Sequence, residues 1–137
     1  MDDFKTGDMA GSALLRIGAI YTQYLKDPDK GIAAYQELLT HYGATKEAVD
    51  ALYEVGAYYL KDAKYDEAIK AYQQFIYNYP KEDRVEDAML AVARCHVEMK
   101  AWDKALDAYQ SYLTKYPAGK SAEFAKAQIA WIRMYHF

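Results

Sequence analysis

Three stretches of the chain align without a gap: KGIAAYQELLTHYG (residues 30–43), EAIKAYQQFIYNYP (67–80) and KALDAYQSYLTKYP (104–117). Each stretch carries a Tyr-Gln pair, and successive pairs lie 37 residues apart. Apolar side chains recur within each stretch at offsets of 3, 7 and 10 residues, which predicts one buried stripe on an α-helix. In the second stretch they are Ile69, Tyr72, Ile76 and Tyr79. Pro80 and Pro117 predict two helix ends, because proline disfavours the α conformation in the residue before it.

A second helix is predicted before each of these stretches. The apolar and small residues around Gly56 recur 37 residues later and 38 residues earlier, around Gly18. We place the extra residue of the first copy in the link at residues 25–29. Asp83 and Glu86 have the spacing of a capping box, so we expect them to cap the third of these helices.

The pattern predicts an all-α chain, since no segment alternates apolar and polar residues with period two. A length of 137 residues suits one domain, residues 1–137. We expect seven helices in it. They form three helix–turn–helix repeats, at about 9–43, 44–80 and 81–117, and a capping helix at about 120–137.

The repeats resemble the tetratricopeptide repeat (TPR) family. The second repeat carries the family pattern at Leu52, Val55, Gly56, Tyr59, Ala68, Tyr72 and Pro80. The resemblance implies a solenoid that binds protein partners and carries no cofactor. The ending Tyr-x-x-Phe-Ile-x-x-Tyr-Pro at residues 72–80 is similar to a bacterial subtype in outer-membrane assembly lipoproteins and Tol-Pal proteins.

The resemblance also implies which residues face the concave groove of the solenoid, where a partner segment would bind. Those we single out are Tyr53, Ala57, Leu60, Lys61, Leu90, Arg94, Phe124, Trp131 and Tyr135. Arg94 and Lys61 would pair with carboxylates of the partner. For Trp131 two interpretations stay open. Either it seals the end of the groove or the natural chain continues past it, or it is part of a docking or self-association surface.

Tyrosine is abundant, with 15 copies. Eight lie on the predicted stripes and are expected in the core. Tyr65 opens a predicted second helix and is expected to pack. The other six fall outside the stripes, and we expect some of them to be exposed: Tyr24, Tyr53, Tyr58, Tyr77, Tyr112 and Tyr135. His96 replaces a tyrosine of the pattern and is predicted to pack in the core, and Cys95 is predicted to be a small buried hydrophobe.

The remaining composition argues against several function classes. The net charge of −3 disfavours nucleic-acid binding, and one cysteine with three scattered histidines predicts no metal site. No catalytic residues converge in the sequence, so we predict no enzyme. No apolar run approaches the roughly 18 residues of a membrane-spanning helix.

The favoured function is a scaffold, adaptor or accessory subunit of a multiprotein complex. The alternative is a periplasmic protein that organises the cell envelope, as the subtype resemblance suggests. A natural start at Met1 would favour the cytoplasm, whereas a removed signal peptide would favour the periplasm. A homo-oligomer stays open as well.

Overall fold

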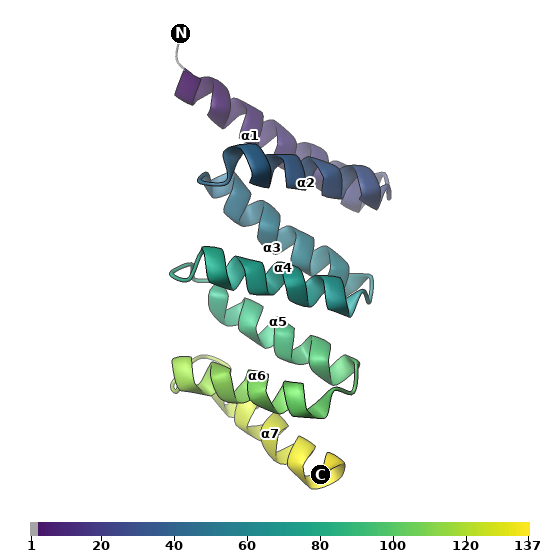
Figure 1. The fold of residues 1–137 in the computed structure, drawn as a ribbon, viewed down its shortest axis with the longest axis vertical. Coiled ribbons are helices and arrows are strands. Elements are labelled where there is room, and N and C mark those ends of the chain that lie inside the picture. Colours follow the sequence, from purple (N-terminus) through teal and green to yellow (C-terminus); the bar gives the residue numbers. More distant parts are fainter. Residues whose placement is uncertain (1–2) are drawn as a thin grey trace. The chain divides into compact units, whose positions relative to one another are not determined.

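The computed structural model describes the backbone of residues 3–137 and the side chains of residues 10–137. The described chain is helical and contains no strand, which confirms the all-α prediction and the seven α-helices. Figure 1 labels these α-helices along the chain. A short π-helix, η1, follows the first of them. The helices are α1 (Asp3–Ala19), η1 (Ile20–Tyr24), α2 (Pro28–Tyr42), α3 (Lys46–Lys61), α4 (Tyr65–Asn78), α5 (Val85–Glu98), α6 (Trp102–Lys115) and α7 (Ala122–His136).

The helices belong to two compact units, Met1–Tyr58 and Tyr59–Phe137. The boundary between the units falls inside α3, so the division does not follow the repeat boundaries. That residues 1–137 act as a single domain stays a prediction.

Glycine allows α1 and α2 of the first unit to approach closely. A Cβ built on Gly18 would overlap the Tyr35 ring, and one on Gly31 would lie 2.9 Å from the carbonyl oxygen of Gly18. Tyr35 and Leu38 are consequently buried, with 1% and 0% of their surfaces exposed. Small residues on both helices thus allow this close approach.

The extra residue of the first repeat lies inside a helix, so its predicted place in the link at 25–29 is wrong. Leu25 N–H donates to the carbonyl oxygen of Ile20 at 3.0 Å, a five-residue bond that defines a π turn. The Thr22 hydroxyl donates to the carbonyl oxygen of Gly18 at 2.9 Å. A π turn adds one residue to a helix without lengthening the following loop, and this accounts for the step of 38 residues.

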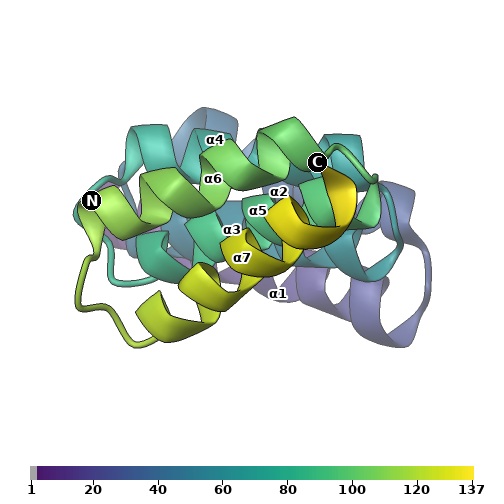
Figure 2. The same ribbon diagram turned by 90° about the horizontal axis from the view of Figure 1, so that it is seen from below.

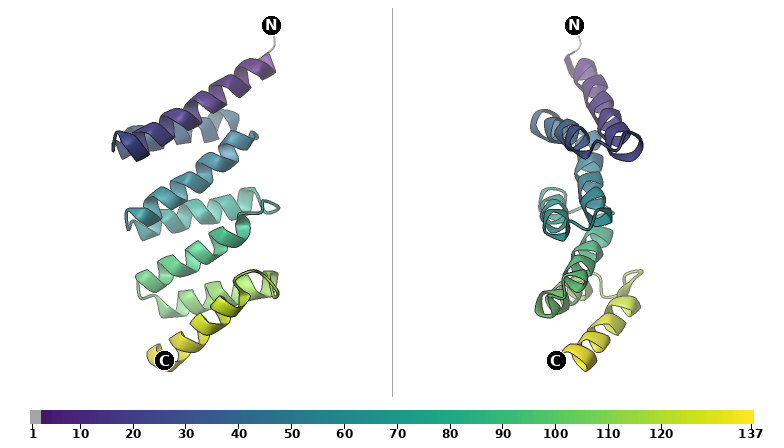
Figure 3. Two further views of the ribbon diagram at one scale, coloured as in Figure 1. Left: turned by 180° about the vertical axis from the view of Figure 1, so that it is seen from behind. Right: turned by 90° about the vertical axis from the view of Figure 1, so that its right-hand side faces the viewer.

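Helices of the second unit lie in two rows. Seen from below, α4 and α6 lie in one row and α5 and α7 in the other (Figure 2). Consecutive helices run in opposite directions (Figure 3). Between the rows α5, α6 and α7 share a core of buried residues: Ala93, Ala105, Tyr109, Tyr112, Ala125, Ile129 and Ile132.

The deepest position of each repeat's second helix differs from the predicted one. Leu38, Phe75 and Tyr112 occupy equivalent positions, and each has 0% of its surface exposed. Ile76, at the predicted stripe position beside Phe75, is only half-buried. Tyr112 is thus a core residue rather than one of the leftover tyrosines. Tyr24 and Tyr77 are indeed exposed, at 77% and 85%.

The turns inside the repeats share one geometry. Ala63 and Lys100 have φ of 58°, in the left-handed region. In both turns the next residue donates its N–H to a carbonyl five residues back, as Ala101 does to His96 at 2.8 Å. This is the Schellman ending of a helix, with an alanine or a lysine at the position that glycine usually occupies.

The predicted capping box at α5 is wrong. Its N-cap residue is Arg84, and no side chain makes a capping hydrogen bond there. Pro80 and Pro117 behave as predicted, because α4 and α6 end at Asn78 and Lys115.

Candidate functional site

An aromatic cluster joins the beginning of α6 to the end of α7. It consists of Trp102, Trp131, Tyr135 and His136. The Trp102 and His136 rings stack with centroids 3.7 Å apart, and Trp131 meets Trp102 edge-on at 5.8 Å. Trp131 and Tyr135 keep 43% and 65% of their surfaces exposed. The cluster brings two of the predicted site residues together and supports them with two residues that the sequence analysis did not single out.

Phe124 lies about two turns before Trp131 on α7. Its ring meets that of Tyr109 edge-on at 6.3 Å, and 54% of the residue is exposed. Met134 and Phe137 are exposed as well, so α7 and the residue after it carry five exposed large apolar side chains. We call Phe124, Trp131, Met134, Tyr135 and Phe137 the α7 apolar surface.

On α5, the predicted site residues Leu90 and Arg94 differ in how far they are buried. Leu90 is half-buried and packs against the core of α5, α6 and α7, whereas Arg94 is exposed. Burial raises the pKa of the Tyr109 hydroxyl, and the charge of Arg94 opposes that rise. Because Arg94 is exposed, its guanidinium is available to a partner carboxylate.

The other predicted residues lie on α3. Leu60 is half-buried and Lys61 is exposed, and both belong to the second unit. Tyr53 and Ala57 are half-buried and belong to the first unit. A single groove that contains all nine residues stays a prediction.

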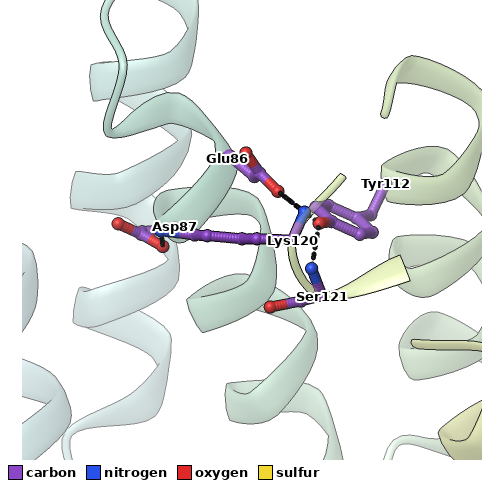
Figure 4. Close-up of polar contacts among 5 residues, drawn as sticks. All are labelled: Glu86, Asp87, Tyr112, Lys120 and Ser121. Carbon is purple, nitrogen blue, oxygen red and sulfur yellow. Dashed lines mark hydrogen bonds and ion pairs between the residues drawn. The ribbon is translucent and has the colours of Figure 1, made fainter. Parts of the chain in front are cut away.

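A polar network fixes the loop between α6 and α7 to α5. The Tyr112 hydroxyl donates to Glu86 Oε2 at 2.5 Å and accepts from the Ser121 N–H at 3.2 Å. The same carboxylate oxygen accepts from the Lys120 N–H at 3.2 Å, and Lys120 Nζ lies 2.8 Å from Asp87 Oδ1 (Figure 4). Burial and then the bond to Glu86 raise the pKa of Tyr112. The network holds α7 and its apolar surface in place.

A pocket of about 780 Å³ lies between α4 and α6 and has part of α5 as its floor. We call it the α4–α6 trough. Apolar lining comes from Ile69 and Ile76 of α4 and from Met89, Val92, His96 and Met99 on and just after α5. Ala108 and Ser111 of α6 leave the space open because their side chains are small.

His96 lines this trough and is only partly buried, so the prediction of a packed core residue is wrong. Its Nδ1 atom is buried and has no hydrogen-bond partner. Burial and then Lys104 lower the pKa of the imidazole, while Asp66 opposes them. The side chain is therefore neutral near pH 7. Its neighbour Cys95 is fully buried as predicted, and burial raises the pKa of the thiol to about 11.

The described side chains contain no group of three or more His, Cys, Asp or Glu residues able to hold a metal ion. Within the same part of the chain, no helix is both long and apolar enough to cross a membrane. The exposed aromatic side chains of α7 and the exposed guanidinium of Arg94 suit protein recognition.

Sequence reasoning singled out exposed residues of the α7 apolar surface but missed the residues that support this surface. Trp102 and His136 were not singled out, because they meet Trp131 only through the packing of α6 on α7. Glu86 was assigned to a helix cap, whereas its carboxylate binds a loop 34 residues further along. The sequence offered one signal for the polar network. Leu38, Phe75 and Tyr112 occupy the same position in the three repeats, and of these only Tyr112 carries a hydroxyl group.

A family model described as tetratricopeptide repeat matches residues 18–83 and again residues 58–120. No curated protein matches the chain. The two matches together cover well over half of the sequence, and they agree with the helical hairpins and the 37-residue step. Repeats of this kind generally mediate protein–protein interaction. The chain belongs to the tetratricopeptide repeat family.

Proposed function

We propose that this protein is a non-catalytic scaffold, adaptor or accessory subunit of a larger complex. It would bind a partner segment through the predicted concave residues, with the α7 apolar surface as the main contact. The observation that carries this proposal is the exposure of five large apolar side chains on or just after one helix. Soluble proteins rarely expose such a patch unless it binds something, and Trp, Tyr, Phe and Met are enriched in interfaces.

Arg94 would add charge selectivity to this contact. It is exposed on α5, the helix that lies in the same row as α7 (Figure 2). A guanidinium pairs well with a carboxylate, so a partner segment with apolar side chains and an acidic residue would suit the surface. The net charge of −3 and the absence of a basic stripe lead us to expect no nucleic-acid partner.

Affinity capture from native extract tests the proposal. The test bait carries Phe124→Ala and Tyr135→Ala, and a matched control bait carries Tyr24→Ala and Tyr77→Ala, which are also exposed. We expect the test bait to lose about tenfold of a captured complex, as interface hot spots do, and the control bait to retain it. Equal recovery by both baits would contradict the α7 surface as the binding site. Recovery of the chain itself would identify a homo-oligomer.

A second candidate function is the organisation of a bacterial cell envelope. The ending Tyr72-x-x-Phe75-Ile76-x-x-Tyr79-Pro80 favours it, through its similarity to the envelope subtype. Fractionation of the native organism with an antibody against the protein tests this role. We expect the protein in the envelope fraction, and recovery from the cytoplasm alone would reject the role.

A further inference from the structure

The first and the last helix of the described chain both leave an apolar face exposed. Ile17 and Ile20, at the end of α1 and the beginning of η1, keep 41% and 45% of their surfaces exposed. Met134 and Phe137, at and just after the end of α7, keep 71% and 68%. The end repeats of a solenoid normally turn a polar face to solvent, because no neighbouring repeat covers them. These two apolar faces therefore call for a partner.

The later repeats show what covers such a face of α1. Ile17 has three equivalents there, none of which exposes more than 8% of its surface: Val55, Val92 and Ile129. Ile129 of α7 belongs to the core that this helix shares with α6 of the preceding repeat. The face of α1 that includes Ile17 thus has the side chains of a contact between successive repeats. We call it the α1 open face, and its residues are Ala10, Ala13, Ile17 and Ile20.

A corresponding face of α7 lacks the neighbour that its equivalent on α5 has. Ala93 of α5 has 0% of its surface exposed and lies in the core with α6, whereas its equivalent on α7, Ala130, is exposed. Met134 is likewise equivalent to Val97, which packs against that core. In the described chain no helix follows α7. The α7 end face, as we define it, consists of Ala127, Ala130, Met134 and Phe137.

The two faces are complementary in size when their helices run antiparallel. Residues of each face follow one another at steps of three, four and three, so each set lies along one side of its helix. Each face begins with two alanines and ends with two large side chains. In the antiparallel register that places Ile17 opposite Ala130, every large side chain meets an alanine, as in a well-packed core. The other three pairs are Ile20 with Ala127, Ala13 with Met134 and Ala10 with Phe137.

The charges of the two units favour a contact between unlike faces. Residues 1–58 contain nine acidic and five basic side chains, whereas residues 59–137 contain eleven and twelve. Two α1 open faces that met would bring two negative units together. Contact between α1 of one copy and α7 of another instead brings a negative unit to a weakly positive one. The occupant that suits each face is therefore the opposite end of a second copy.

We propose that copies of this chain associate head to tail, with the α1 open face of one copy packed antiparallel on the α7 end face of the next. The contact uses Met134 and Phe137. It leaves Phe124, Trp131 and Tyr135, about 100° further around α7, to the proposed partner segment, and it does not rest on the proposed function.

The geometry of this contact determines how the association should behave. Two copies joined through unlike faces leave one face of each kind unoccupied, so further copies can add to form a chain or a ring. Each face is about 15 Å long and about 10 Å wide. That is small beside the roughly 800 Å² that each partner buries in a standard interface, so the association is weak and depends on concentration.

Sedimentation equilibrium of the intact chain tests whether it associates. We expect the mean mass to rise above that of a single chain as the concentration is raised from about 10 μM to about 1 mM, the range of weak contacts. A chain that stays monomeric throughout this range would overturn the proposal.

Two variants with one blocked face each test which faces meet. Ala13→Glu blocks the α1 open face and Ala130→Glu blocks the α7 end face, and both alanines are exposed, so the core is untouched. We expect each variant alone to associate at least about tenfold more weakly, because burying an unpaired carboxylate is unfavourable. An equimolar mixture should form a complex of two chains, since each variant keeps the face that the other has lost.

Other arrangements predict different outcomes for these variants. Continued self-association of Ala13→Glu would mean that two α7 end faces meet, and that of Ala130→Glu would mean that two α1 open faces meet. Either result contradicts the proposal, and so does a mixture that stays monomeric while the natural chain associates. The matched control Ala33→Glu, at an exposed alanine of α2, should associate like the natural chain. Circular dichroism verifies that all three variants are folded.

An exchange of a large and a small side chain tests the register. Ile17→Ala and Ala130→Ile should each weaken the association about fivefold, and the variant with both should recover most of it, because a large side chain again meets a small one. Ile17→Ala combined with Ala127→Ile should not recover, since Ala127 lies opposite Ile20. A variant with both Ile17→Ala and Ala130→Ile that associates no better than the single variants would contradict the antiparallel contact.

The variants also separate this proposal from the proposed function. Phe124→Ala with Tyr135→Ala should leave self-association unchanged, and Ala13→Glu should leave the capture of a partner complex unchanged. Failure of either proposal is therefore recognised independently of the other.

Discussion

The two loops that join successive repeats in the second unit have nearly the same backbone but different side-chain chemistry. Tyr79 and Tyr116 have φ of −129° and −127°, and their carbonyls accept from Glu82 at 3.1 Å and Gly119 at 3.0 Å. The core residue under the first loop is Phe75, and Arg84 lies over its ring at 5.8 Å.

Tyr112 takes the place of Phe75 under the second loop. Its hydroxyl binds both Glu86 and the loop backbone at Ser121. The comparison shows that backbone and register are set by the repeat, whereas the polar contacts of each loop depend on one or two residues. It also explains Gly119, which stands where the first loop has Glu82.

Of all substitutions in the two loops, we expect the largest loss of stability at Gly119. A Cβ there would lie 2.6 Å from both Glu86 Oε2 and the Tyr112 hydroxyl and 2.9 Å from Tyr116 Cβ. We expect Gly119→Ala to lower the free energy of unfolding by about 2–3 kcal/mol, measured by urea denaturation. The control, Glu82→Ala at the equivalent position, removes an ion pair with Arg84 at 3.1 Å and should change it by about 1 kcal/mol or less. Similar losses of stability from both substitutions would mean that the polar network does not limit the size of the side chain at residue 119.

Removing the hydroxyl tests the network directly. Tyr112→Phe makes the second loop resemble the first and leaves the Ser121 N–H and the Glu86 carboxylate short of a partner. We expect a loss of about 1–2 kcal/mol in the free energy of unfolding. Combined with Glu86→Gln, the two losses should be less than additive, because both changes remove the same bond. Full additivity would contradict the coupling.

Alkaline pH offers a further test, because Phe75 cannot ionise and Tyr112 can. Burial and then Glu86 raise the pKa of Tyr112 above its ordinary value of 10.0. The folded chain holds this proton more tightly than the unfolded chain. The stabilisation is therefore complete below pH 10.0 and is lost as the pH rises through the raised pKa.

The stability difference between the natural chain and Tyr112→Phe should accordingly stay constant up to about pH 10 and shrink as the pH rises above it. Urea denaturation of both proteins across this range measures it. The subtraction removes the contributions of the other tyrosines, since both proteins share them. A constant difference would show that the Tyr112 hydroxyl titrates alike in the folded and unfolded chains.

The smallest effect is expected from the ion pair at the edge of the network. Lys120 Nζ and Asp87 Oδ1 lie 2.8 Å apart, but the lysine side chain keeps 62% of its surface exposed. A double-mutant cycle with Lys120→Ala and Asp87→Ala should give a coupling of about 0.5 kcal/mol that fades in high salt. A coupling as large as that of Tyr112 with Glu86 would place the ion pair among the main stabilising contacts.

The sequence predicts the fold well because its signals are local and occur three times. The helix ends before Pro80 and Pro117 and the burial of Cys95 follow from the residues themselves and their immediate neighbours. The stripe position was misassigned because offsets of six and seven residues both fall near the buried side of a helix. Only packing decides between Phe75 and Ile76.

Longer-range features were beyond sequence reasoning for a physical reason. Glu86 has cap spacing, yet its carboxylate finds the Tyr112 hydroxyl and a loop N–H, partners that depend on how α6 and α7 pack. His96 likewise lines a pocket together with residues of another helix, Ala108 and Ser111, and packing alone brings them together. For the predicted site, exposure of Arg94 and of the α7 residues agrees with the sequence, while a common groove stays a prediction.

The π turn at Ile20–Tyr24 bears on how the repeats can be exchanged. Because the length difference lies in a helix rather than in a loop, the following turn keeps its length and its left-handed residue, Lys26, as in the other repeats. A chimera that replaces the first helix with that of the second repeat must therefore delete one residue between Gly18 and Leu25 and keep the link unchanged. In a duplicated gene, this helix could gain a codon while the spacing of the later repeats stayed the same.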